Sequence, residues 1–130
     1  MRSRISGWRL LLRTFSIATI MGSAAAVSAT LAGASDVFLS RLEDLPLAPG
    51  LSEDATAGLS FDSAAGRIVE AYARGNLTED QVLRFYGETL PQLGWTAESQ
   101  RQYRRGGERL RLELTQGGQG LTVHYSLSPQ

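Results

Sequence analysis

Two stretches of alternating apolar and polar residues near the C-terminus constrain the fold of this 130-residue chain more than any other feature. In Glu108–Gln116 every second residue from 110 to 114 is a leucine: Leu110, Leu112 and Leu114. In Leu121–Leu127 the alternating apolar residues are Leu121, Val123, Tyr125 and Leu127. Because successive side chains of a β-strand point to opposite faces, each stretch predicts a strand with one apolar face.

A loop over residues 117–120 joins these two strands in a consistent register. With that loop, Leu114 faces Val123, Leu112 faces Tyr125 and Leu110 faces Leu127. A slip of one residue would turn every apolar side chain of one strand to the other side, so this agreement favours the pairing. The segment is therefore predicted to be an antiparallel hairpin with one apolar and one polar face.

Residues 78–95 carry the signals of one amphipathic helix and of both its ends. Thr78 is the predicted N-cap, and Gln81 three residues later completes a capping box. Gly94 suits the left-handed residue that ends a helix, and Trp95 can then contact Leu90. The apolar face has helical spacing and comprises Val82, Phe85, Tyr86, Thr89, Leu90 and Leu93.

Three further segments are predicted to be strands: Leu59–Asp62, Arg67–Arg74 and Thr96–Arg105. A tight turn at Gly106-Gly107 would place Arg101 on the apolar face, so we expect the strand that carries Arg101 to lie at an edge or at the end of the sheet, where Arg101 can reach water. The predicted fold class is α+β: a single amphipathic helix packed on an antiparallel sheet of four to five strands. We expect this two-layer sandwich to be preceded by a signal or anchor helix.

Residues 1–34 have the composition of a secretory signal peptide. Residues 1–13 contain four arginines and no acidic residue, and an uncharged run over residues 14–34 follows them. This run ends in Ala32-Gly33-Ala34, a pattern that signal peptidase recognises. We expect cleavage after Ala34 and a periplasmic or secreted location. The uncharged run has 21 residues, close to the ~20 that span a bilayer. The alternative is therefore a retained inner-membrane anchor that holds the domain outside the cytoplasm.

The chain after the signal is predicted to divide into a linker and a compact domain. Residues 35–58 are acidic and contain Pro46 and Pro49, so we expect a linker with a short helix over Asp36–Asp44. Residues 59–130 contain the predicted helix and strands and are expected to form the compact α+β domain.

Residues 85–95 carry a longer motif, Phe-Tyr-Gly-Glu-Thr-Leu-Pro-Gln-Leu-Gly-Trp. This FYxxxLPxxGW signature, together with residues 44–50 and 61–71, resembles an uncharacterised alphaproteobacterial family of exported proteins. The resemblance covers about residues 44–127. It implies export, but it assigns no activity and no functional residue to this chain.

The composition after residue 34 argues against several classes of function. Nine arginines stand against thirteen acidic residues, a net charge of −4. General nucleic-acid binding needs a strong basic excess, so no nucleic-acid partner is predicted. The chain has no cysteine, which excludes thiol catalysis, disulfides and cysteine-bound zinc or iron–sulfur centres. No cofactor and no metal are predicted.

His124, the only histidine, is the one residue that suggests acid–base or metal chemistry. The predicted hairpin register sets it opposite Glu113 on the outward face. A histidine with a single carboxylate is not a zinc site. We therefore interpret His124 as a surface residue paired across strands, and an enzyme that uses it is an alternative.

Four arginines are expected to gather at the Gly106-Gly107 hairpin: Arg104, Arg105, Arg109 and Arg111. The register sets Arg104 directly opposite Arg109, and like charges in this arrangement cost stability unless an anion lies between them. The cluster is either a solvated hairpin tip relieved by Glu108 and Glu113 or a surface for an anionic partner.

These observations predict an exported, non-catalytic binding or accessory domain of the cell envelope. Its partner would be an envelope protein or an anionic envelope component, with membrane contact only through an uncleaved N-terminal segment. The alternatives are a membrane-anchored structural protein that keeps its N-terminal helix and a small enzyme that uses His124.

Overall fold

The computed structural model describes residues 37–130. The predicted signal peptide, including Ala32 and Ala34 at its cleavage site, lies outside the described residues. Among residues 37–130, no helix has both the length and the apolar character needed to cross a membrane.

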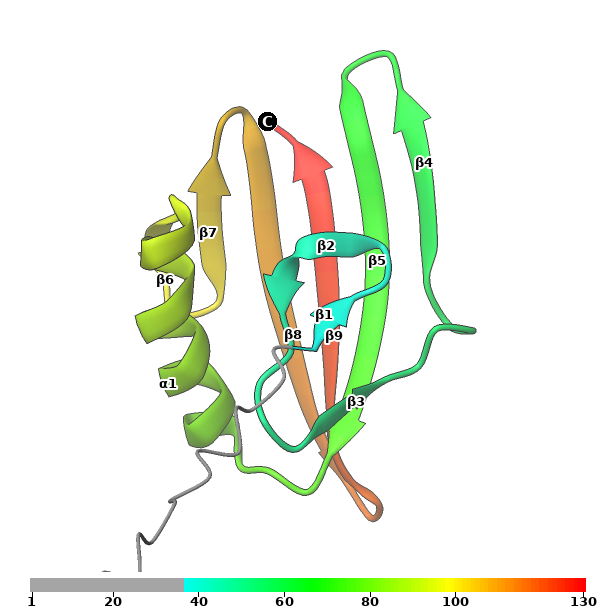
Figure 1. Cartoon of the computed structure of the whole chain (residues 1–130), viewed down its shortest axis with the longest axis vertical. Helices are drawn as coiled ribbons and strands as arrows, with labels where there is room; N and C mark the ends of the chain where they lie inside the picture. The colour runs from blue at the N-terminus through cyan, green and yellow to red at the C-terminus, as the bar shows by residue number, and fades with distance from the viewer. Residues whose placement is uncertain (1–36) are drawn as a thin grey trace, which may run out of the picture. The chain divides into compact units, whose positions relative to one another are not determined.

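The main element of the fold is an antiparallel sheet of seven strands (Figure 1). Its strand order is β3-β5-β9-β8-β7-β6, and β4 pairs with β5 beside β3. A separate two-stranded sheet is formed by β1 and β2. The strands are β1 Phe38–Leu39, β2 Leu42–Pro46, β3 Leu51–Glu53, β4 Leu59–Ser63, β5 Gly66–Gly75, β6 Thr96–Ser99, β7 Gln102–Arg105, β8 Glu108–Gly117 and β9 Gly120–Pro129. Helix α1 spans Glu79–Thr89 and continues as a short 3₁₀ helix over Leu90–Leu93.

The predicted fold class is wrong in its balance of strand and helix. Strands make up 56% of the structure and helices 16%, and two sheets of seven and two strands replace the expected sheet of four to five. The extra strands come from two places: residues 38–53 form β1, β2 and β3, and residues 96–105 form two strands where one was predicted.

The segment expected to be a linker with a short helix forms β1, β2 and β3 instead. Leu39, Leu42 and Leu45 each have a side chain that is at most 2% exposed. The spacing of Leu39 and Leu42 suits one side of a helix, but the chain reverses within this segment, so that Leu39 pairs with Leu42 and Phe38 with Pro46. Burial of these leucines against the sheet outweighs the local preference, and the segment supplies part of the core.

The predicted strand over residues 96–105 is interrupted at Gln100 and Arg101. The Ser99 hydroxyl accepts a hydrogen bond from the Arg101 backbone N–H at 3.2 Å, which favours a turn over an extended strand. Arg101 therefore does not point into the apolar face. Its guanidinium lies 2.7 Å from the carboxylate of Glu79 at the start of α1.

The C-terminal hairpin and the helix ends confirm their predictions. Leu110 pairs with Leu127, Leu112 with Tyr125 and Leu114 with Val123. Thr78 and Gln81 form both hydrogen bonds of the capping box. Gly94 has a left-handed backbone with φ of 86°, and the Trp95 N–H donates to the Leu90 carbonyl at 3.0 Å.

The core lies between one face of the large sheet and the two elements that cover it, α1 and the β1–β2 hairpin (Figure 1). Tyr86 of α1, fully buried, shows that both elements lie on the same face. Its hydroxyl donates to the Pro46 carbonyl of β2 at 3.0 Å and lies 2.8 Å from the hydroxyl of Tyr125 on β9. We call the covered side the inner face and the opposite side the outer face.

Candidate functional site

The outer face of the sheet is polar at its centre because β8 and β9 alternate strictly. Leu121, Val123, Tyr125 and Leu127 point inward and are buried, so the residues between them point outward. These residues are Thr122, His124, Ser126 and Ser128, and all four are only partly buried. The prediction of one apolar and one polar face for this hairpin is confirmed.

His124 is the centre of a connected group of side chains on this face. Its ring stacks on Tyr72 of β5, with 4.4 Å between centroids and 4° between planes. Its Nδ1 lies 3.3 Å from the Glu113 carboxylate of β8, and its Nε2 contacts the Glu70 carboxylate of β5. The Ser126 hydroxyl donates to the other oxygen of Glu70 at 2.9 Å. The predicted pairing of His124 with Glu113 is confirmed, and Glu70 is a second partner that sequence reasoning missed.

The arrangement around His124 does not match that of a nucleophilic catalyst. In such a site the histidine ring accepts a proton from a serine or thiol nucleophile. Here the Ser126 hydroxyl contacts Glu70, and both ring nitrogens of His124 face carboxylates. A neutral imidazole can donate from only one nitrogen, so only the imidazolium can donate to both carboxylates. Among residues 37–130, no group of three or more acidic or histidine side chains is arranged to hold a metal ion.

The structure divides the predicted arginine cluster between the two faces. Arg104, Arg109 and Arg111 share the outer face with His124, because Arg104 pairs with Arg109 and Arg111 with Ser126 of β9. Arg105 points to the inner side: its guanidinium lies 4.3 Å from the centroid of the Trp95 ring. Three of the four arginines therefore lie together, and Arg105 is not one of them.

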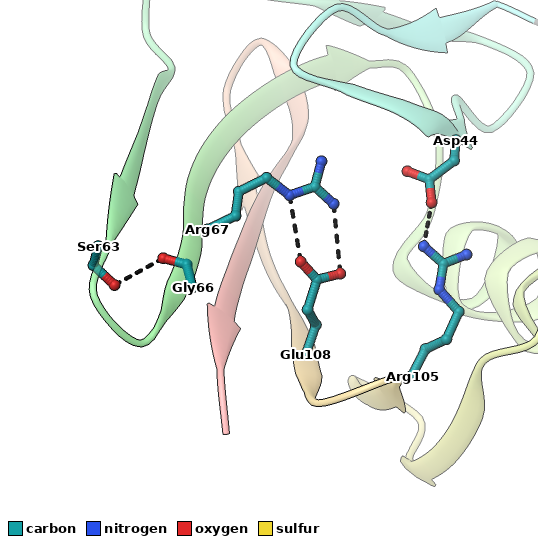
Figure 2. A network of polar contacts seen from close by, with 6 residues as sticks. All are labelled: Asp44, Ser63, Gly66, Arg67, Arg105 and Glu108. Atoms are coloured by element: carbon teal, nitrogen blue, oxygen red, sulfur yellow. Dashed lines mark hydrogen bonds and ion pairs between the residues drawn. The ribbon is translucent and has the colours of Figure 1, made fainter.

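Glu98 relieves the repulsion between the two facing arginines. Its carboxylate lies 3.8 Å from Arg104 and 3.4 Å from Arg109. The acids expected in this role are engaged elsewhere, Glu113 with His124 and Glu108 with Arg67 (Figure 2). Sequence reasoning missed Glu98 because it treated residues 96–105 as one strand. Folded back as β6, Glu98 reaches the arginines of β7 and β8.

Arg111 differs from its neighbours in its partners. Within the described residues, no carboxylate lies within ion-pairing distance of its guanidinium. The side-chain amide of Gln102, oriented with its oxygen toward Arg111, accepts from two guanidinium nitrogens at 3.0 and 3.2 Å. A neutral amide fixes the guanidinium in place without compensating its charge.

A hollow of about 210 Å³ connects Arg111 with the His124 group. Its lining is Arg109, Arg111, Glu113, His124, Ser126 and Ser128. Every lining residue is polar or charged, and two guanidinium groups and the Ser128 hydroxyl are available as hydrogen-bond donors, since the Ser126 hydroxyl donates to Glu70. We call this hollow the outer-face pocket. A larger hollow of about 470 Å³ lies between α1 and the β6–β7 hairpin and is lined in part by Leu83, Gly87, Ala97 and Tyr103.

The charged residues at the rim of the inner face serve the fold instead. Figure 2 shows Arg105 in contact with Asp44 of β2, and Arg67 of β5 in contact with Glu108 of β8. The distance from Arg67 to the Glu108 carboxylate is 3.3 Å. Burial alone would raise the pKa of Asp44, but the hydrogen bond and charge of Arg105 outweigh it and hold that pKa below its ordinary value. The Asp44–Arg105 contact therefore attaches the β1–β2 hairpin to the edge of the sheet.

Comparison of the chain with protein-family models, curated proteins and solved structures found no match. The resemblance of residues 85–95 to an exported family therefore stays a prediction. In the structure this motif forms the end of α1, its C-cap and the entry to β6.

Proposed function

We propose that this protein is an exported, non-catalytic binding domain of the bacterial cell envelope, and that the outer-face pocket recognises an anionic group. The observation that carries the proposal is Arg111, held by the Gln102 amide and facing no carboxylate among residues 37–130. A positioned guanidinium without a counter-ion presents a planar set of donors that suits a carboxylate or a phosphate.

The neighbours of Arg111 supply further donors for such a group. Arg109 uses its Nε for Glu98 and has other guanidinium nitrogens, and the Ser128 hydroxyl lines the same pocket. Glu113 is the acidic residue on the pocket lining, and it stands against the two guanidinium groups of Arg109 and Arg111. Positive charge therefore predominates on the Arg109–Arg111 side.

The size of the pocket limits what it can hold. Pockets that enclose a whole small-molecule ligand have volumes of ~300–1,000 Å³, and the outer-face pocket is smaller at about 210 Å³. A single anionic group on a larger envelope component fits this volume. The geometry of His124 favours binding over catalysis, because both its ring nitrogens are engaged by Glu70 and Glu113.

Titration of the full chain with inorganic phosphate, followed by NMR amide shifts, tests the proposal. We expect saturable shifts confined to the neighbourhood of Arg111 and Ser128. Arg111→Gln should weaken binding about tenfold or more, since a hydrogen bond to a charged group contributes ~1.5–3 kcal/mol. Arg84→Gln removes an exposed arginine from α1 and is the matched control. Shifts that are absent, or that Arg84→Gln reduces as much as Arg111→Gln, would contradict an anion site at Arg111.

Binding to an envelope component needs a second measurement. Vesicles with and without anionic lipid, together with envelope extract, are incubated with the protein and with a variant that carries Arg104→Ala, Arg109→Ala and Arg111→Ala. We expect the unchanged protein to bind an anionic component, either the anionic vesicles or a component of the extract. The variant should lose that binding. Equal recovery by both proteins would exclude the outer face as the recognition surface.

A further inference from the structure

Strand β4 leaves one edge of the large sheet uncovered. Within the described residues β4 pairs only with β5, and Figure 1 shows no element on its other side. The exposed side chains of Leu59 and Phe61 lie on the outer face, since they pair with Glu70 and Ile68 of β5. Leu59 is 47% exposed and Phe61 52% exposed. The β4 edge therefore combines unpaired backbone groups with exposed apolar side chains.

The opposite edge of the sheet is protected in a way that the β4 edge is not. At that edge, β6 is four residues long and has a register shift between Ala97 and Ser99, and Glu98 carries a charge in its middle. Short length, irregularity and charge are the features that keep edge strands from pairing. By contrast, β4 pairs regularly with β5 over five residues and contains no arginine and no proline. Its one charged residue is Asp62.

We propose that the β4 edge binds a second copy of this chain, β4 to β4 and antiparallel, about a two-fold axis at Phe61. This register sets Phe61 against the partner's Phe61, and Leu59 against the partner's Ser63. Asp62 lies opposite the partner's Ser60, which can donate a hydrogen bond to it. A register centred on Asp62 would instead oppose two carboxylates, which is destabilising. The strand is thus complementary to itself in the register that pairs all five residues.

The area of the contact predicts a weak dimer. Stable interfaces bury ~800 Å² on each partner, and weak, transient ones bury less. The contact offers one five-residue strand with two largely exposed apolar side chains, Leu59 and Phe61. We therefore expect an equilibrium that shifts with protein concentration. Directly paired residues of neighbouring strands point to the same side of a sheet. The outer faces of both copies would therefore lie on one side of a continuous sheet. The dimer itself does not depend on the proposed anion site.

Sedimentation equilibrium of the purified full chain over a wide concentration range tests the dimer. We expect the average mass to rise from one chain toward two, and Phe61→Asp to hold it at one chain throughout. Val37→Asp is the matched control, because Val37 is 59% exposed and lies outside β4. Circular dichroism and thermal melts establish that both variants remain folded. A wild-type protein that stays a monomer, or a dimer that survives Phe61→Asp, would overturn the proposal.

The absence of cysteine from the chain allows a second test that needs no loss of binding. Directly opposed side chains in a sheet have Cβ atoms ~4.5–5.5 Å apart, close to the reach of a disulfide. Phe61→Cys should therefore form a disulfide-linked dimer on mild oxidation. Ser60→Cys, one residue away and pointing to the other face, should not. Cross-linking through residue 60 but not residue 61 would refute the register.

Discussion

The Tyr86 hydroxyl joins α1, β2 and β9, and Tyr86→Phe removes this connection while keeping the ring. Tyr86 is fully buried, as is Tyr125, so neither hydroxyl has access to water as a substitute partner. The change removes the bonds to the Pro46 carbonyl at 3.0 Å and to the Tyr125 hydroxyl at 2.8 Å. Each neutral hydrogen bond contributes ~0.5–1.5 kcal/mol, and the groups left unpaired add to the loss. We expect the free energy of unfolding to fall by about 2–3 kcal/mol.

Urea unfolding followed by circular dichroism measures this loss. The urea concentration at the midpoint of unfolding should fall. The slope of the free energy of unfolding with urea concentration should stay constant, because the surface exposed on unfolding hardly changes. In thermal melts, a loss of this size corresponds to about 8–24 °C for a domain of this length. Tyr72→Phe is the control, because the Tyr72 hydroxyl on the outer face has no hydrogen-bond partner among the described residues. Its effect should stay within ~0.5 kcal/mol.

The same residue predicts how stability changes at alkaline pH. Burial raises the pKa of Tyr86 to about 12 and also raises the pKa of Tyr125. An unfolded tyrosine has a pKa of ~10, so below pH ~10 the stability from neutral, buried Tyr86 is fully present. It is lost as pH rises from ~10 toward 12, by about 3 kcal/mol for this residue. Tyr86→Phe should flatten the alkaline fall. An unchanged fall, or a loss below ~0.5 kcal/mol at neutral pH, would refute this account of the Tyr86–Tyr125 pair.

Three further outcomes follow from other residues. Asp44→Asn should lower stability at neutral pH by less than about 1 kcal/mol, because the carboxylate is 47% exposed. The pKa of Asp44 is lowered in the folded state, so the stability that this carboxylate contributes is present above pH ~4 and is lost as pH falls further. The urea midpoint of Asp44→Asn should therefore fall less at acid pH than that of the wild type. Thr78→Ala removes the N-cap and should cost ~1 kcal/mol in urea unfolding, with Thr78→Ser restoring most of it. We expect export and cleavage after Ala34, so mass spectrometry of the purified chain should find Ser35 as the first residue, and an intact N-terminus would favour the membrane-anchored alternative.

Predictions that rest on residues close together in the sequence agree with the structure. The capping box of Thr78 and Gln81 and the left-handed Gly94 depend on hydrogen bonds within one or two helical turns. The register of β8 and β9 depends on a short loop and on strict alternation, which allows only one pairing with a continuous apolar face. The contact between His124 and Glu113 follows from that register alone.

The candidate site was predicted only in part, because its remaining residues come from distant strands. Glu70 is 54 positions before His124 and reaches it only because β5 pairs with β9. Glu98 reaches Arg109 only because residues 96–105 fold back on themselves. Neither contact can be predicted from nearby residues. The alternation of apolar and polar residues shows which face of a strand is buried, but it does not show which strands lie beside those of Glu70 and Glu98.

The sequence by itself determined the helix, its ends and the C-terminal hairpin, because local hydrogen bonds and side-chain periodicity have one consistent solution there. Only the tertiary structure decided that residues 38–53 form strands that cover the core, and that Arg105 contacts Asp44 of β2 on the inner side of the sheet. The physical reason is the same in both cases. Leu39 and Leu42 suit a helix or a strand locally, and burial against the finished sheet decides between them. Strand alternation turns Arg105 away from Arg104, and its partner there, Asp44, lies 61 positions earlier in the chain.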